Sequence, residues 1–287
     1  MIKLANLPLV DVKGDSMRNE HLAAFGVLAF GVVLLLLNFY FNRYFYHDDA
    51  YISLRYALNL VNHGDLSWNV GDRVEGYTNF LHLTSAAGLI ALGFEPVLAT
   101  QVINILGAVL LVGAVVVGAN MAAPGQENAL PRAVAITAAL AAEGMAAWVL
   151  GGLEAVLAAG LVGAAIACLV PLFRSGWPER IDLPALAGLF FAMAYLTRPD
   201  SVVMNAAAGF AVLGLGAAAL RTRIRQFLVI GIIPFTVLVL HMAWRLDYYG
   251  DYLPNTFFAK VGVDVGTRLA MVPFYFAKSF AKKVLGR

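Results

Sequence analysis

Long apolar segments without any charged residue constrain this chain more than any other feature of its sequence. The run from Leu22 to Phe41 contains no Asp, Glu, Lys or Arg, and neither does the run from Pro96 to Asn120. A helix rises about 1.5 Å per residue and the hydrocarbon core of a bilayer is about 30 Å thick, so roughly 20 apolar residues can cross it. With 61% hydrophobic and 13% charged residues, the chain is predicted to be an all-α polytopic membrane protein.

The charge and cysteine content exclude several classes of protein. A formal net charge of +2, without a dense basic run interleaved with aromatic residues, argues against a nucleic-acid partner. Cys168 is the single cysteine, so the chain can form neither an internal disulfide nor a Cys-based metal site. The histidines lack metal-ligand spacing. We therefore predict no metal site, although paired aspartates in the first loop would also suit a divalent cation.

Seven segments are predicted to span the membrane: 22–42, 96–120, 132–149, 153–173, 184–198, 201–219 and 226–244. Residues 1–21 are interpreted as a cytoplasmic tail, and the first span as retained, because no small-residue cleavage site follows it. An eighth apolar segment, 77–94, carries several polar residues and could either cross the bilayer or lie at its surface.

The basic residues decide between these two topologies, because cytoplasmic segments carry an excess of Lys and Arg. If 77–94 spans, five arginines between 174 and 225 fall outside. If it is a re-entrant or surface helix, nine basic residues lie inside, against four in the outer segments before the last span. We therefore predict seven spans, a cytoplasmic N-terminus and a first outer loop at 43–95 that contains amphipathic and re-entrant helices.

The first outer loop opens with two adjacent carboxylates, Asp48 and Asp49, in the stretch HDDAYISLRYALNL. The next segment, 50–62, is predicted to be an amphipathic surface helix because apolar residues recur there at helical spacing. These residues are Tyr51, Leu54, Leu58 and Val61. One Asp suffices to cap such a helix, whereas two adjacent carboxylates repel each other, so a functional role is favoured over capping alone.

Further polar motifs reach the same outer face in the seven-span topology. They are RVEGYTNFLHL (73–83), GGLEAVL (151–157), LTRPD (196–200) and YYGDYLPNTFFAK (248–260). Glu154 could simply complement a helix dipole. Pro199 can begin a helix, so Arg198 beside its positive N-terminus is either an anion site or a polar turn. Polar chemistry is therefore predicted to gather on the outer face.

In this order the five motifs resemble the bacterial GT-C superfamily of glycosyltransferases that use polyprenyl-phosphate sugars. The closest likeness is to terminal arabinofuranosyltransferase-like and mannosyltransferase-like members, over about residues 20–262. The resemblance implies a GT-C-like module at 22–262 in the cell (inner) membrane. That module would transfer sugar, on its extracytoplasmic face, to a glycan, lipid or protein acceptor. It also implies an essential acidic residue after the first span, at Asp48 or Asp49, and a second at Glu154.

The chemistry of such a transfer needs a base and charge stabilisation, and no nucleotide or organic cofactor. A carboxylate takes the proton of the acceptor hydroxyl, and direct displacement inverts the anomeric carbon. Asp48 is favoured slightly over Asp49 because it lies nearer the first span. Candidate ligands of the donor phosphate are Arg55, two helical turns after Asp48, and Arg198, Arg73 and Lys260. Candidate substrate-binding residues are Tyr51, Glu75, Tyr77, Asn79, Asp200 and Asn255.

Two alternatives remain open. Family members usually continue with further spans, whereas a basic tail occupies 263–287 here, so a non-catalytic truncated member is one of them. The other is a transporter or flippase for a lipid-linked or anionic solute, which would show charges at mid-membrane depth and broken helices in two related halves. Apart from Glu143, inside the predicted span 132–149, the polar motifs cluster on one outer face, and this favours chemistry at the surface over transport.

Overall fold

The computed structural model describes residues 12–125, 128–176 and 179–256, and these residues fold almost entirely into helices. The helices are α1 (Val12–Asn42), α2 (Ala50–His63), α3 (Phe80–Ala91), α4 (Pro96–Ala122), α5 (Ala129–Leu140), α6 (Glu143–Leu150), α7 (Ala155–Leu169), α8 (Asp182–Thr197), α9 (Val202–Leu215) and α10 (Leu220–Tyr249). There are also two short 3₁₀ helices: η2 (Val170–Phe173) directly follows α7, and η3 (Pro199–Ser201) directly precedes α9.

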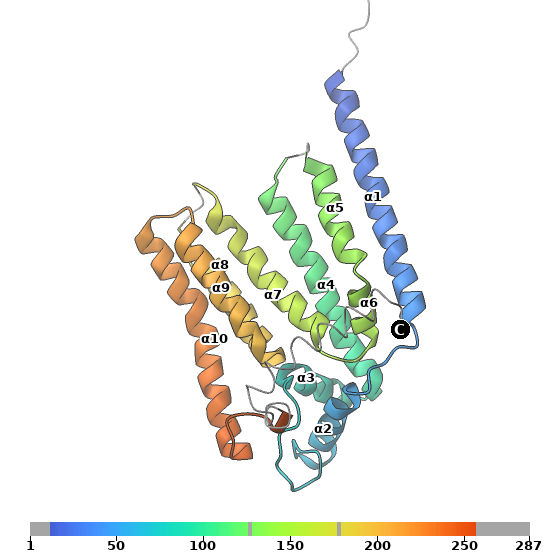
Figure 1. The fold of residues 1–287 in the computed structure, drawn as a ribbon, viewed down its shortest axis with the longest axis vertical. Coiled ribbons are helices and arrows are strands. Elements are labelled where there is room, and N and C mark those ends of the chain that lie inside the picture. Colours follow the sequence, from blue (N-terminus) through green and yellow to red (C-terminus); the bar gives the residue numbers. More distant parts are fainter. Residues whose placement is uncertain (1–11, 126–127, 177–178, 257–287) are drawn as a thin grey trace, which may run out of the picture.

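Most of the helices run side by side from one end of the molecule to the other (Figure 1). α7 packs between α4 and α8, α8 packs against α10, and α1 packs against α5 and α6. The two short helices α2 and α3 pack against each other at one end of this layer. We call this end, where α2 and α3 lie, the loop end.

The length and composition of the helices confirm a polytopic helical membrane protein. Among the described residues, four helices can cross a bilayer: α1 from Met17, α4, α7 together with η2, and α10. The pair α5 and α6, bent by 41° at its break, would be a fifth. The 16-residue α8 and the 14-residue α9 are about 24 and 21 Å long, shorter than the hydrocarbon core, so the count of seven is not established.

The first loop contains the two predicted helices, and one of them, α2, buries polar as well as apolar residues. α3 is a 12-residue helix at the loop end, too short to cross a bilayer. α2 begins at Ala50, as predicted, yet Tyr51 on its predicted apolar face is exposed while Ser53 and Asn59 are buried. Leu54 of the predicted face is buried, and Leu58 and Val61 are half-buried, because α2 packs against α3.

Glycines let α4 and α7 pack closely against each other. A Cβ atom added to Gly107 would lie 2.6 Å from the Cα of Leu157, and one added to Gly160 would overlap the carbonyl oxygen of Gly107. Within a bilayer, small residues at a helix interface let the two backbones approach and gain dispersion contacts. The α4–α7 contact therefore depends on the absence of side chains at these two positions.

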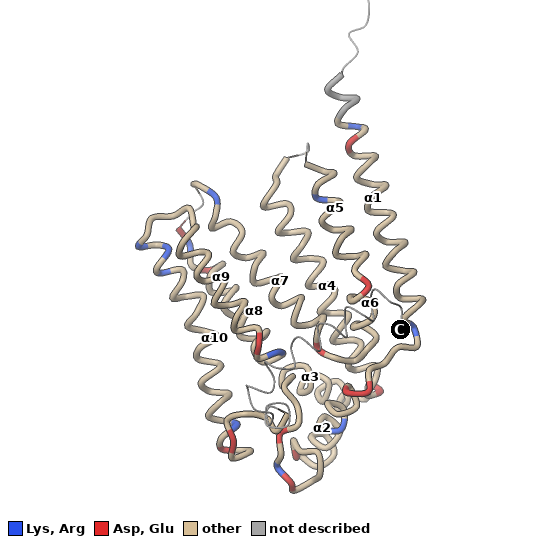
Figure 2. The backbone as a smooth tube through the Cα atoms, in the orientation of Figure 1, with Lys and Arg blue, Asp and Glu red and all other residues tan. Residues whose placement is uncertain are grey.

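Charged residues gather at the two ends of the helices, with few between them in the described part of the chain (Figure 2). The end opposite the loop end is rich in arginine, and neighbouring helices are joined there. Arg174 donates to the carbonyl of Met121 at 2.9 Å, and Arg132 donates to Asn120 at 2.8 Å. We call it the arginine end. It carries Arg132, Arg174, Arg180, Arg221, Arg223 and Arg225.

Candidate functional site at the loop end

A cavity of about 440 Å³ lies at the loop end, where five separate segments of the chain meet. We call it the carboxylate cavity. The segments are the start of α2, the strap before α3, the α6–α7 turn, the α8–η3 turn and the segment after α10. Five predicted site residues line the cavity: Asp49, Tyr77, Asn79, Glu154 and Arg198. The fold thus gathers in one place residues that are up to 149 positions apart in the sequence.

Glu154 is the central acidic group of this cavity. Its side chain is only 12% exposed. One carboxylate oxygen accepts a hydrogen bond from the Asn79 amide at 3.1 Å, and the other accepts from Arg198 Nη1 at 3.4 Å. Because a buried carboxylate is costly without such partners, these two donors stabilise Glu154 and fix its orientation.

Asn79 connects Glu154 to α2. Its side chain is buried and is hydrogen-bonded to the Ser53 hydroxyl, with Oδ1–Oγ and Nδ2–Oγ distances of 3.2 and 3.0 Å. Ser53 lies one helical turn after Asp49, so both side chains are on the same face of α2. A hydrogen-bonded network therefore runs from Ser53, one helical turn from Asp49, through Asn79 to Glu154.

Arg198 is the cation among the described residues that line the cavity. Its Nε and Nη2 groups donate to the two carboxylate oxygens of Asp200 at 3.1 and 3.0 Å. This pairing raises the pKa of Arg198 and lowers the pKa of Asp200. Since three of the five guanidinium N–H groups serve Asp200 and Glu154, two are left to bind an anion.

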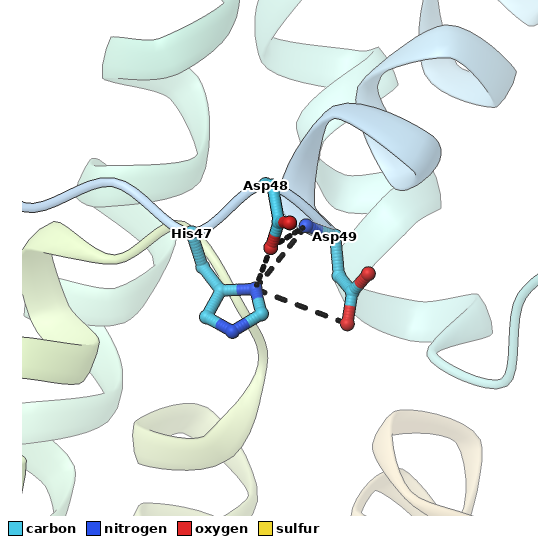
Figure 3. Close-up of side chains that lie close together, drawn as sticks. All are labelled: His47, Asp48 and Asp49. Atoms are coloured by element: carbon cyan, nitrogen blue, oxygen red, sulfur yellow. Dashed lines mark hydrogen bonds and ion pairs between the residues drawn. The ribbon is translucent and has the colours of Figure 1, made fainter.

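The adjacent aspartates occupy different positions (Figure 3). The Asp48 side chain is 94% exposed and does not line the cavity, whereas that of Asp49 is 66% exposed and does. His47 Nδ1 lies 3.1 Å from an Asp48 oxygen and 3.9 Å from an Asp49 oxygen. In the described part of the chain, these three side chains form the group that could hold a metal ion.

Capping does not account for the aspartate pair in this structure. Asp49 is the N-cap residue of α2 but makes no side-chain hydrogen bond to the helix. The N–H groups of Ala50, Tyr51 and Ile52 donate instead to the backbone carbonyls of residues 47 to 49. The N–H groups in the first turn of α2 are thus hydrogen-bonded to backbone carbonyls and need no side-chain cap. The Asp49 carboxylate is left to line the cavity.

Two predicted phosphate ligands lie away from the cavity. Arg55 donates to the carbonyl of Trp68 at 3.3 Å, and the guanidinium of Arg73 stacks over the Tyr248 ring at 4.3 Å. Arg55 was predicted by counting helical turns from Asp48, but Asp48 precedes α2, so that helical phase does not apply. Lys260 lies outside the described residues.

The remaining predicted substrate ligands differ in their surroundings. Tyr77 is buried and lines the cavity, and its hydroxyl lies 3.0 Å from that of Tyr249. Tyr51 is exposed and packs edge-on against Tyr46, and Asp200 holds Arg198. Neither of these two lines the cavity.

Glu75 is engaged in a buried ion pair and is not free to bind substrate. One of its oxygens accepts from Arg245 Nη2 at 2.6 Å and from Nε at 2.8 Å, and both side chains are 4% exposed. Burial raises the pKa of Glu75, although the neighbouring guanidinium opposes this. The Glu75 carbonyl accepts the backbone N–H of Asn255, which lines a neighbouring cavity.

The sequence analysis did not identify Arg245, the partner of Glu75, or six residues of the cavity lining: Ile52, Ser53, Gly76, Thr78, Leu153 and Thr256. The spacing of Ser53 from Asp49, one helical turn, could have identified it. Arg245 is an ionisable residue at the end of a spanning helix, which is itself a signal of a buried partner.

No protein-family model matches the chain, and comparisons with curated proteins and with solved structures find no significant match.

Proposed function

We propose that this protein is a membrane glycosyltransferase that moves a sugar from a polyprenyl-phosphate donor to a hydroxyl group of a cell-envelope acceptor. The observation that supports this most is the meeting of Asp49, Glu154 and Arg198 around one cavity. The segments that line this cavity belong to the loop end, where the long apolar helices end (Figure 1). A donor can therefore keep its lipid chain in the bilayer while its phosphate and sugar enter the cavity.

Asp49 is the proposed base. The Asp49 side chain is exposed and, among the described residues, accepts no hydrogen bond from an amide or guanidinium group. Glu154, the other carboxylate in the described lining of the cavity, is hydrogen-bonded to Asn79 and Arg198. Asp49 would take the proton of the acceptor hydroxyl while that oxygen attacks the anomeric carbon. The bond from the anomeric carbon to the phosphate oxygen breaks, and the lipid phosphate leaves with the electron pair. A single displacement of this kind inverts the configuration.

Arg198 is the proposed partner of the departing phosphate. Its N–H groups that do not serve carboxylates can donate two charge-assisted hydrogen bonds to phosphate oxygens. Asp200 and Glu154 fix the guanidinium before the donor arrives, which lowers the entropic cost of this contact. No nucleotide or organic cofactor is required, because the lipid phosphate is already a leaving group.

The proposed topology is the GT-C-like one with seven spans. α8 and α9 run beside the longer helices, and short helices are accommodated by local thinning of the bilayer (Figure 1). The arginine end would then be cytoplasmic by the positive-inside rule, and the carboxylate cavity extracytoplasmic. This places the reaction on the side where cell-envelope acceptors lie.

The test is transfer of labelled sugar from a panel of polyprenyl-phosphate donors in membranes that contain only this chain. Asp49→Asn should reduce transfer by roughly 10²–10⁴-fold, because the amide cannot accept the proton. Asp48→Asn removes the same charge one residue earlier and serves as the matched control, with transfer expected within a few-fold of the parent chain. Near-normal transfer by Asp49→Asn would show that Asp49 is not the base.

A divalent cation offers a different explanation for the acidic pair, and the same assay distinguishes it. Removal of divalent ions by EDTA should leave transfer unchanged if Asp49 acts as a base. Loss of transfer both on chelation and in Asp48→Asn would instead assign His47, Asp48 and Asp49 to a bound ion.

Transport of a lipid-linked or anionic solute is the second candidate, and the break between α5 and α6 favours it. This bent pair places Glu143 at the start of α6, and broken helices often form transporter sites. Movement of an intact lipid-linked sugar across vesicles, without transfer to an acceptor, would support this alternative. Donor binding with neither transfer nor movement would indicate a non-catalytic family member.

A further inference from the structure

We propose that a second cavity, next to the carboxylate cavity, binds the acceptor, and that this acceptor is a carbohydrate. The inference rests on the proposed function, and it names the class of acceptor. The second cavity has a volume of about 400 Å³, and Trp68, Asn69, Asp72 and Asn255 contribute to its lining. We call it the tryptophan cavity.

The lining of the tryptophan cavity has the chemistry that recognises a sugar ring. Trp68 is 43% exposed, so its indole is accessible from the cavity. A sugar ring presents an apolar C–H face that packs on an aromatic ring, while its hydroxyls point outward from the edge. Asn69, Asp72 and Asn255 supply amide donors and carbonyl or carboxylate acceptors for such hydroxyls.

The charge of the tryptophan cavity favours a neutral polyhydroxyl ligand over a second phosphate group. The described lining contains the carboxylate of Asp72 and no lysine or arginine, whereas the described lining of the carboxylate cavity contains Arg198. A lipid phosphate therefore finds a cationic hydrogen-bond donor at Arg198 in the carboxylate cavity and none in the described lining of the tryptophan cavity. The two cavities thus divide the chemistry between acceptor and donor.

The loop that carries Trp68 is fixed before any ligand binds. The Asp65 carboxylate accepts from the backbone N–H of Gly71 at 2.6 Å and from the hydroxyl of Tyr248 at 2.8 Å. The Trp68 carbonyl accepts from the side-chain amide of Asn59 at 2.9 Å. Because these bonds already order the loop, little conformational entropy is lost when a ligand packs on Trp68.

The two cavities share a wall, so an acceptor in one can reach the other. Ile52 and Gly76 line both cavities. The Tyr56 hydroxyl holds this wall by donating to the Val74 carbonyl at 2.7 Å and accepting from the Gly76 N–H at 2.8 Å. A saccharide packed on Trp68 could therefore extend a terminal hydroxyl past Ile52 toward Asp49.

The proposal is tested by saturation-transfer difference NMR on the full chain in detergent micelles. The probes are the methyl glycosides of glucose, galactose, mannose and arabinose, with the acyclic polyol sorbitol as the negative control. At least one glycoside should show saturation transfer, and Trp68→Ala should reduce it by roughly fivefold or more. Trp68→Phe keeps an aromatic face and should retain about half of the saturation transfer of the parent chain.

Matched variants keep this result interpretable. Tyr44 is another exposed aromatic residue at the loop end and lines neither cavity, so Tyr44→Ala should bind the glycosides as the parent chain does. Asp49→Asn should also bind them, although it loses transfer. Undiminished binding by Trp68→Ala would overturn the proposal.

The remaining outcomes separate this inference from the proposed function. A chain that transfers sugar but shows no saturation transfer to any glycoside would refute the tryptophan cavity and leave the transferase assignment standing. A chain that binds glycosides through Trp68 but transfers sugar from no donor would refute the transferase assignment and leave the carbohydrate site standing.

Discussion

At the scale of single residues, the pair of Glu75 and Arg245 shows how a buried charge links distant parts of this chain. It joins the strap before α3 to the end of α10 at an N–O distance of 2.6 Å. Glu75→Ala would leave the guanidinium buried without a counter-charge, which costs about 3–5 kcal/mol. Glu75→Ala combined with Arg245→Met removes both charges and should recover most of this loss. Thermal unfolding midpoints measured in detergent test this prediction. Equal midpoints for Glu75→Ala and for the double variant would contradict it.

The same scale shows what the sequence could and could not predict about the site. Asp49, Glu154 and Arg198 were predicted because polar residues at the ends of apolar spans are conspicuous, and the topology places those ends together. Their division of roles could not be predicted, because it depends on side-chain partners such as Asn79. The preference for Asp48 used proximity to the first span, which does not tell which of two neighbouring side chains borders a cavity.

At the scale of helices, the contact between α4 and α7 rests on two missing side chains. A Cβ atom at Gly160 would meet backbone of α4, which cannot move aside as a flexible side chain can. Gly160→Ala should therefore cost about 1–3 kcal/mol, despite the better helix propensity of Ala. Gly113→Ala on α4 is the control, since an added Cβ there has nothing within 4 Å. Thermal unfolding measures both, and a Gly160→Ala variant as stable as Gly113→Ala would refute this account of the contact.

Helix positions were predicted well where hydropathy alone determines them, and less well where neighbours intervene. The predicted segments 184–198 and 201–219 correspond to α8 (Asp182–Thr197) and α9 (Val202–Leu215). The predicted and observed limits differ by no more than four residues at either end of each helix. The segment 132–149 was predicted as one span, yet it divides into α5 and α6. Asn38 of α1 donates to the carbonyl of Ala141 at the break, a contact between helices that hydropathy does not reveal.

At the scale of the whole molecule, the two ends of the helix layer differ in charge and in structure (Figure 2). The distribution of basic residues predicted that the arginines at 132, 174 and 221 to 225 share one end of the molecule. That prediction needs only the order of the apolar segments along the chain. The loop end carries the cavity, and Arg198 reaches it only because the α8–η3 turn lies there beside Glu154. Whether α8 and α9 cross the membrane therefore decides on which side of it Arg198 lies.

Cysteine labelling tests this path directly. With Cys168 replaced by Ala, the variants Ala122→Cys and Ala219→Cys place a thiol at the arginine end, and Asn62→Cys, Asp200→Cys and Asp251→Cys place one at the loop end. An impermeant thiol reagent added outside intact cells should label the second group and not the first. If α8 and α9 did not cross, five spans would leave Asp200 and Ala219 on the same cytoplasmic side while Asp251 stayed outside. Protection of Asp200→Cys together with labelling of Asp251→Cys would thus contradict the seven-span topology. It would also separate Arg198 from Asp49 and remove the basis of the proposed transfer.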